Sequence, residues 1–183
     1  MKKTKDKSEF SIVVEDIPRD GLFLNYSQLE RGMAQFDPDK SMLRGSGRLE
    51  LFRQGKDVQI KGELDALIAL PCDRCLVSFE QEVATDFFYL LRPSSEFIAE
   101  NPGELQVTEE NVDEYWYEDG IIRADDLFRE QILLKLPVRN LCSRECKGLC
   151  PGCGADLNRE ECRCEAKEPE GPFAVLKGVV VKE

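Results

Sequence analysis

The sequence predicts an α+β protein: an antiparallel β-meander with a few short helices and a C-terminal cysteine-rich module of the zinc-knuckle type. Three observations lead to this prediction. Apolar and polar residues alternate through most of residues 47–91, a helical pattern covers residues 123–137, and six of the eight cysteines lie between residues 142 and 164. Period-two alternation indicates half-buried strands, and closely spaced cysteines indicate a metal site.

The meander is predicted from three consecutive stretches. Even positions from Val58 to Leu70 are apolar or glycine, and polar residues occupy most odd positions, which is the pattern of a half-buried strand. GRLELFR at 47–53 precedes this strand across QGKD, whose glycine and aspartate suit a tight turn. Alternation resumes at 77–91, after PCDRCL at 71–76. The sequence therefore predicts three antiparallel strands with a cysteine pair at the second bend.

Shorter elements are expected before the meander. FSIVVEDIP at 10–18 and GLFLNY at 21–26 have the composition of strands. SQLERGMAQF at 27–36 resembles a short helix that opens at Ser27, with Glu30 three residues later as a capping box.

After the meander, the region near 96–120 is acidic and broken by proline and glycine, which predicts a solvated loop with an edge strand at 115–117. RADDLFREQILLKLP at 123–137 predicts a helix that has Asp125 and Asp126 near its N-terminal end and stops at Pro137. Its apolar stripe comprises Phe128, Ile132 and Leu136. The predicted organisation is an α+β domain over 1–137, a metal-binding module over 138–166, and a linker with a short tail over 167–183.

Charge and composition limit the function classes. The net charge is −11, and residues 96–130 hold twelve acidic residues against Arg123 and Arg129, so that this segment carries −10. A general nucleic-acid binder is expected to show a large basic face, which this composition does not offer. No apolar run resembles a signal peptide or is long enough to cross a bilayer. We therefore expect a cytoplasmic protein without membrane partners, in which the thiols stay reduced.

The cysteine spacings are those of metal ligands. They are Cys72-x2-Cys75, Cys142-x3-Cys146-x3-Cys150-x2-Cys153 and Cys162-x-Cys164. Thiolates two or three residues apart reach one tetrahedral ion when the backbone turns tightly between them, and the chain has no histidine to share the site. Eight cysteines suffice for two zinc sites of four thiolates each.

Two partitions of the cysteines fit the spacings. The preferred one places Cys72, Cys75, Cys142 and Cys146 on one ion and Cys150, Cys153, Cys162 and Cys164 on the other. The alternative, in which Cys142, Cys146, Cys150 and Cys153 share an ion, fits nearly as well. Five cations lie beside these cysteines, as counter-charge for the thiolates or as candidate RNA contacts: Arg74, Arg144, Lys147, Arg159 and Arg163.

Other cysteine chemistry fits less well. The spacings differ from the ferredoxin patterns of closed iron–sulfur clusters. A dithiol redox pair at Cys72 and Cys75 normally opens a helix, whereas here it joins two predicted strands. A cysteine nucleophile usually needs a histidine base. An enzyme is therefore not expected, nor is a small-molecule substrate.

Several motifs resemble the YceD family of large ribosomal RNA subunit accumulation proteins. They are CDRCL after a strand, LKLPVRNLC at a helix end, CKGLCPGCGADLN, CRC and FAVLK, within about residues 45–178. The tail departs from the family pattern, because EGPFAVL stands where many relatives have Asp-Pro-Arg. The resemblance implies a non-enzymatic factor for large-subunit rRNA accumulation or processing in ribosome biogenesis. Its partner is then this RNA, its precursor or a ribosomal protein.

Two other functions stay open from the residues alone. One is a protein-binding adaptor whose acidic segment 96–130 engages a basic partner. The other is an iron–sulfur or dithiol redox protein.

Overall fold

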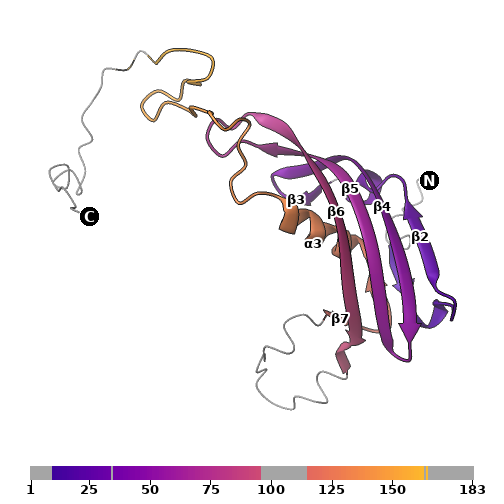
Figure 1. Ribbon diagram of the computed structural model, residues 1–183. Coiled ribbons are helices and arrows are strands. Elements are labelled where there is room, and N and C mark those ends of the chain that lie inside the picture. Colours follow the sequence, from indigo (N-terminus) through magenta and orange to yellow (C-terminus); the bar gives the residue numbers. More distant parts are fainter. Residues whose placement is uncertain (1–9, 34, 96–114, 163, 165–183) are drawn as a thin grey trace, which may run out of the picture.

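A long antiparallel sheet is the central element of the computed structural model, which describes residues 10–33, 35–95, 115–162 and 164. Its strand order is β2-β4-β5-β6-β7, with β3 also paired to β4 (Figure 1). All neighbouring strands are antiparallel except β7, which runs parallel to β6. The strands are β2 (Leu22–Tyr26), β3 (Gln35–Asp37), β4 (Lys40–Gln54), β5 (Asp57–Pro71), β6 (Ser78–Pro93) and β7 (Tyr115–Tyr117).

A smaller sheet and short helices complete the described fold. β1 (Ser11–Val13) pairs antiparallel with β8 (Ile121–Arg123), and the 3-10 helix η1 (Val14–Asp16) follows β1. The α-helices are α1 (Glu30–Met33) and α3 (Ala124–Lys135). The α+β class and the antiparallel sheet are therefore confirmed.

The long strands follow the predicted alternation, with one extension. β5 shows regular alternation of buried and exposed residues from Asp57 to Pro71. β4 begins at Lys40, seven residues before the predicted start at residue 47. A register shift between Met42 and Arg44 interrupts the period-two pattern there. The bulge therefore interrupts the alternation, and the first half of this strand could not be predicted from it.

The helix predicted over 27–36 is wrong over most of its length. α1 covers only Glu30–Met33, and β3 follows at Gln35. The Glu30 carboxylate accepts a hydrogen bond from the Gly45 backbone N–H in β4 at 3.0 Å. It therefore pairs with a backbone donor of a strand and not with the backbone at the start of its own helix. The strand predicted over 10–18 is also shorter, because only β1 is extended and η1 follows it.

α3 packs against the inner face of the long sheet. Phe128 and Ile132 are fully buried, as predicted, and Leu136 is partly buried against the same core. The Phe128 ring contacts Tyr26 edge-on, with ring centroids 5.4 Å apart, and Phe87 at 6.0 Å. The sheet makes room for this ring at a glycine, because a Cβ on Gly47 would lie 2.6 Å from Phe128.

Substitution of Gly47 by valine is expected to destabilise the protein by about 1–3 kcal/mol, since overpacking forces the ring or the strand to move. Ser46→Val is the matched control on the exposed outer face of β4 and is expected to change stability by less than about 0.5 kcal/mol. Urea unfolding followed by circular dichroism measures both. Equal midpoints for the two variants would contradict the packing of Phe128 beneath Gly47.

Two predicted regions lie largely outside the described residues. The acidic loop near 96–120 is described only from Tyr115, where β7 confirms the predicted edge strand. The linker and tail over 167–183 fall entirely outside the described part. Within the described ranges, none of the helices is long and apolar enough to cross a membrane.

Candidate metal centres

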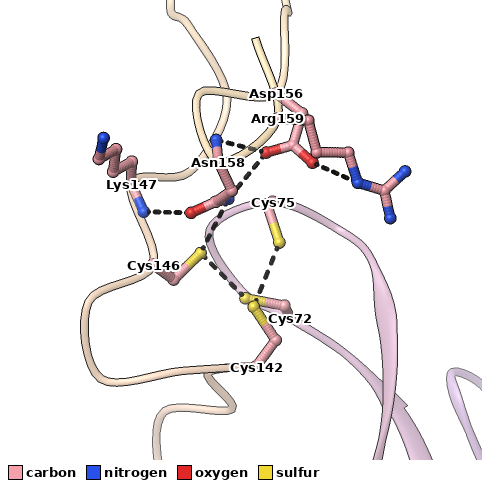
Figure 2. A network of polar contacts seen from close by, with 8 residues as sticks. All are labelled: Cys72, Cys75, Cys142, Cys146, Lys147, Asp156, Asn158 and Arg159. Carbon is pink, nitrogen blue, oxygen red and sulfur yellow. Dashed lines mark hydrogen bonds and ion pairs between the residues drawn. The ribbon is translucent and has the colours of Figure 1, made fainter.

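The first cysteine cluster joins the β5–β6 turn to the segment after α3. Cys72 and Cys75 follow the end of β5, whereas Cys142 and Cys146 lie about seventy residues later in sequence (Figure 2). All four Sγ atoms lie within 4.8 Å of one another. The Cys72 and Cys146 sulfurs are 3.8 Å apart, and those of Cys75 and Cys142 are 3.6 Å apart. Three of these cysteines are buried and Cys142 is exposed.

The second cluster is built within the module itself. The Sγ atoms of Cys150, Cys153, Cys162 and Cys164 lie within 4.8 Å of one another. Cys150 is buried, Cys162 is half-buried and the other two are exposed. The eight thiols are thus grouped as in the preferred partition, and the alternative set of Cys142, Cys146, Cys150 and Cys153 is not brought together.

The sulfur spacing suits a tetrahedral ion better than disulfides. A tetrahedral metal with metal–sulfur bonds of about 2.3 Å places its sulfur atoms about 3.8 Å apart. The separations of neighbouring sulfurs in the structure run from 3.1 Å for Cys150 and Cys162 to 4.0 Å for Cys150 and Cys164. A disulfide needs about 2.05 Å. All eight cysteines are free, so each cluster offers four soft donors that could bind one metal ion.

Hydrogen bonds attach the module to the β5–β6 turn. The Asp73 N–H donates to the Asn140 carbonyl at 2.8 Å, and the Asn140 N–H donates to the Asp73 carboxylate at 2.7 Å. The Leu149 N–H donates to the Arg74 carbonyl at 3.1 Å. Figure 1 shows the module beyond the end of the long sheet where β5 and β6 are connected. The first cluster therefore lies at a docked junction of two distant segments.

Two residues in the left-handed region shape this junction. Leu76, directly after Cys75, has φ 61°, and its N–H donates to the Cys72 carbonyl at 2.9 Å to close the turn. Gly148 has φ 76°, and a Cβ there would lie 3.1 Å from the Arg74 carbonyl oxygen. A side chain at residue 148 would therefore push the module away from the turn.

The comparison with protein families gives a match that covers the whole cysteine-bearing region. The family model described as "Large ribosomal RNA subunit accumulation protein YceD" matches residues 60–179, about two thirds of the chain. The chain belongs to the YceD family. The matched range includes all eight cysteines of both clusters.

A curated relative supports the same family. "Large ribosomal RNA subunit accumulation protein YCED homolog 1, chloroplastic" from Arabidopsis thaliana is 26% identical over 154 residues. The alignment covers 70% of this YceD chain and 47% of the relative, so the chain spans about half the length of that protein. No solved structure matches the chain.

Asn158, in the YceD string CKGLCPGCGADLN, connects the segment at Cys146 and Lys147 to the turn at Asp156. Its Nδ2 donates to Cys146 Sγ at 3.5 Å and to Asp156 Oδ1 at 2.7 Å, and its Oδ1 accepts the Lys147 N–H at 2.8 Å (Figure 2). Sequence reasoning gave Asn158 no role beyond the family string. Only the fold brings it against a sulfur twelve residues away.

The candidate RNA-contacting cations differ in their surroundings. Arg74 Nη1 donates to the Cys146 carbonyl at 2.7 Å, and Arg159 forms an ion pair with Asp156 at 3.4 Å. Arg144 and Lys147 are exposed. Arg163 lies outside the described residues. Arg74 and Arg159 thus have structural contacts of their own, and whether any of the five contacts RNA stays a prediction.

The thiols of each cluster ionise unequally. Burial raises the pKa of Cys72, but hydrogen bonds from the backbone N–H groups of Cys142, Cys75 and Arg74 outweigh it and lower this pKa to about 6. The hydrogen bond with Cys75, followed by burial, raises the pKa of Cys142 to about 12.

The second cluster repeats this asymmetry. The backbone N–H of Cys153, together with the Cys162 thiol and the Gly152 N–H, lowers the pKa of Cys150 to about 6. Hydrogen bonds with Cys153 and Cys162 raise the pKa of Cys164 to about 12. In each cluster the thiolate with the lowered pKa opposes ionisation of the neighbouring thiols, because like charges repel. A divalent cation among the sulfurs would offset this repulsion.

Proposed function

We propose that this chain is a non-enzymatic factor for the accumulation or processing of large-subunit rRNA, stabilised by two structural zinc ions. This proposal is supported by membership of the YceD family and by the name of the relative, because both descriptions refer to accumulation of the large ribosomal RNA subunit. The cytoplasmic location predicted from the sequence is part of the proposal, because reduced thiols are required for zinc binding.

Zinc is favoured over other metals by the donor set. Four thiolates without an open position form the closed site that zinc occupies in structural roles. We expect about two zinc ions per chain by elemental analysis of protein purified without added metal and without oxygen. A coloured protein that contains iron and acid-labile sulfide would instead support the iron–sulfur alternative.

The network around Asn158 gives a test of the first site. Asn158→Ala removes the hydrogen bond to Cys146 Sγ, and loss of such a partner typically lowers metal affinity by about 10–100-fold. We expect this loss at the first site only, measured by competition with a chromophoric chelator. Arg159→Ala is the control, since this exposed residue contacts Asp156 but no sulfur. Equal metal affinities in the two variants would mean that Asn158 does not strengthen metal binding at the first site.

The rRNA role is tested by depleting the protein in the organism that encodes it. We expect mature large-subunit rRNA to fall relative to small-subunit rRNA, and the wild-type protein to restore the ratio. Complementation by Cys146→Ser is expected to fail when this variant is expressed at wild-type levels. An unchanged rRNA ratio after depletion would refute the proposed role, whatever the metal content of the protein.

The proposed partner is large-subunit rRNA, its precursor or a ribosomal protein. The exposed Arg144 and Lys147 support an RNA contact at the module, next to the first cluster. Replacing both by glutamine is expected to reduce cosedimentation with large-subunit precursors while leaving two zinc ions bound.

A further inference from the structure

The outer face of the long sheet is uncovered in the described part of the chain. The buried side chains of β1, β8, α1 and α3 join one core with the inner-face residues of β4, β5 and β6. On the outer face, three aromatic side chains remain open to solvent: Phe23 is 56% exposed, Phe52 39% and Phe88 57%. Large exposed aromatics on one face of a sheet are typical of interaction surfaces.

Three adjoining hollows form a groove on this face. The first has a volume of about 460 Å³ and lies beside Phe88. It shares Arg48 and Glu63 with a second hollow of about 300 Å³. The second shares Ser46 and Asp65 with a third of about 400 Å³. From Lys61 to Asp65 along β5 the groove extends about 14 Å, which accommodates four or five residues of an extended peptide.

The groove has more acidic than basic side chains. Arg48 is hydrogen-bonded to Glu63, and Arg44 lies 3.9 Å from Glu82. Glu50, Asp65 and Asp86 form no ion pair within the described part of the protein. The charged residues that line the groove are the acids Glu30, Glu50, Glu63, Asp65, Glu82 and Asp86 and the bases Arg44, Arg48 and Lys61.

We infer that this groove binds an extended, arginine- and lysine-rich segment of a partner protein. Six acids against three bases attract a cationic ligand, and two of those bases already face a carboxylate. Phe88 at one end offers an aromatic face on which a guanidinium group stacks. A nucleic acid is disfavoured, because the same carboxylates repel its phosphates. This inference goes beyond the proposed function, since neither zinc nor RNA takes part in it.

The test uses the full-length, zinc-loaded protein and fluorescence anisotropy. The probes are a fluorescein-labelled peptide of six Arg-Ser repeats, the same peptide with glutamine for arginine, and a twelve-residue oligouridylate. We expect the arginine peptide to bind, and the glutamine peptide and the oligonucleotide to bind at least tenfold more weakly. Binding of the oligonucleotide as tight as that of the arginine peptide would overturn the inference.

Variants locate the binding site. Asp65→Asn with Asp86→Asn neutralises two exposed groove carboxylates without changing their size, and we expect about tenfold weaker binding of the arginine peptide. The control, Glu15→Gln with Asp20→Asn, removes the same charge from exposed residues outside the groove and is expected to change binding less than twofold. Equal losses in both pairs, or no binding by the wild type, would refute the groove as the site. Unfolding midpoints of both pairs verify that the fold is retained.

Discussion

Cys146→Ser is expected to reduce the zinc content from about two ions to about one per chain and to release the module from the β5–β6 turn. The first cluster would lose one of its four sulfurs, and a structural zinc site contributes its binding energy directly to folding. The amide hydrogens of Asp73 and Asn140 should then exchange freely with solvent, because no metal ion joins the two segments. Hydrogen exchange and elemental analysis measure the two effects.

Cys153→Ser is the matched comparison in the second cluster. It is also expected to remove one zinc ion, but protection of the β5–β6 turn should persist, because this cluster lies within the module. A loss of protection as large as in Cys146→Ser would mean that the two clusters fold as one unit. Unchanged zinc content in both variants would refute the assignment of these cysteines as ligands.

Zinc affinity is expected to rise steeply with pH between about 6 and 9. Hydrogen bonds with neighbouring thiols, followed by burial, raise the pKa of Cys142 to about 12 and that of Cys164 to about 12. The pKa of Cys75 and that of Cys162 are raised from 9.0 as well. At neutral pH each site therefore has at least two thiols that must lose protons when zinc binds.

The sign of the effect follows from this proton release. Two protons released per site imply that affinity falls by about 100-fold for each pH unit of acidification. Below about pH 6 the dependence steepens, because Cys72 and Cys150, whose pKa is about 6, then become protonated too. In the metal-free protein these two lowered pKa values add stability above pH 9 that is lost as the pH falls through about 6.

Proton release can be measured directly. Titration of metal-free protein with zinc at pH 7.4 in a weakly buffered indicator solution should release at least about four protons per chain. Repeating the titration at pH 6.5 and pH 8.5 gives the dependence of affinity on pH. Affinities that do not change with pH would show that the thiols are already ionised before zinc binds.

Elements with regular alternation were predictable from the sequence. β5 and most of β6 follow the pattern because each has one buried and one exposed face. β8, with only three residues, and β3 were missed, since such short strands depend on their partners rather than on their own pattern. The parallel pairing of β7 with β6 depends on a distant contact that no local signal reveals.

The cysteines of the candidate site were predictable, but their surroundings were not. Spacing identified all eight residues and favoured the observed grouping, although it could not exclude the other. The observed grouping goes with the docking of Asn140 against Asp73, a tertiary contact that brings the segment with Cys142 to the turn with Cys72 and Cys75. The roles of Asn158 and Asp73 were not predicted for the same reason: Asn158 contacts Cys146 and Asp73 contacts Asn140, and neither partner is a neighbour in sequence.

The separation of Cys75 from Cys142 by 67 positions has a consequence for biosynthesis. Half of the first site leaves the ribosome early and stays incomplete until the chain has been extended past residue 146. Closing a loop of this length costs about 4 kcal/mol in chain entropy, less than the roughly 10–16 kcal/mol that a structural zinc ion supplies. If zinc fills this site as proposed, maturation of a newly made molecule ends with ion capture, and we expect a cell short of zinc to accumulate chains whose sheet is folded while Cys142 and Cys146 are not docked on the β5–β6 turn.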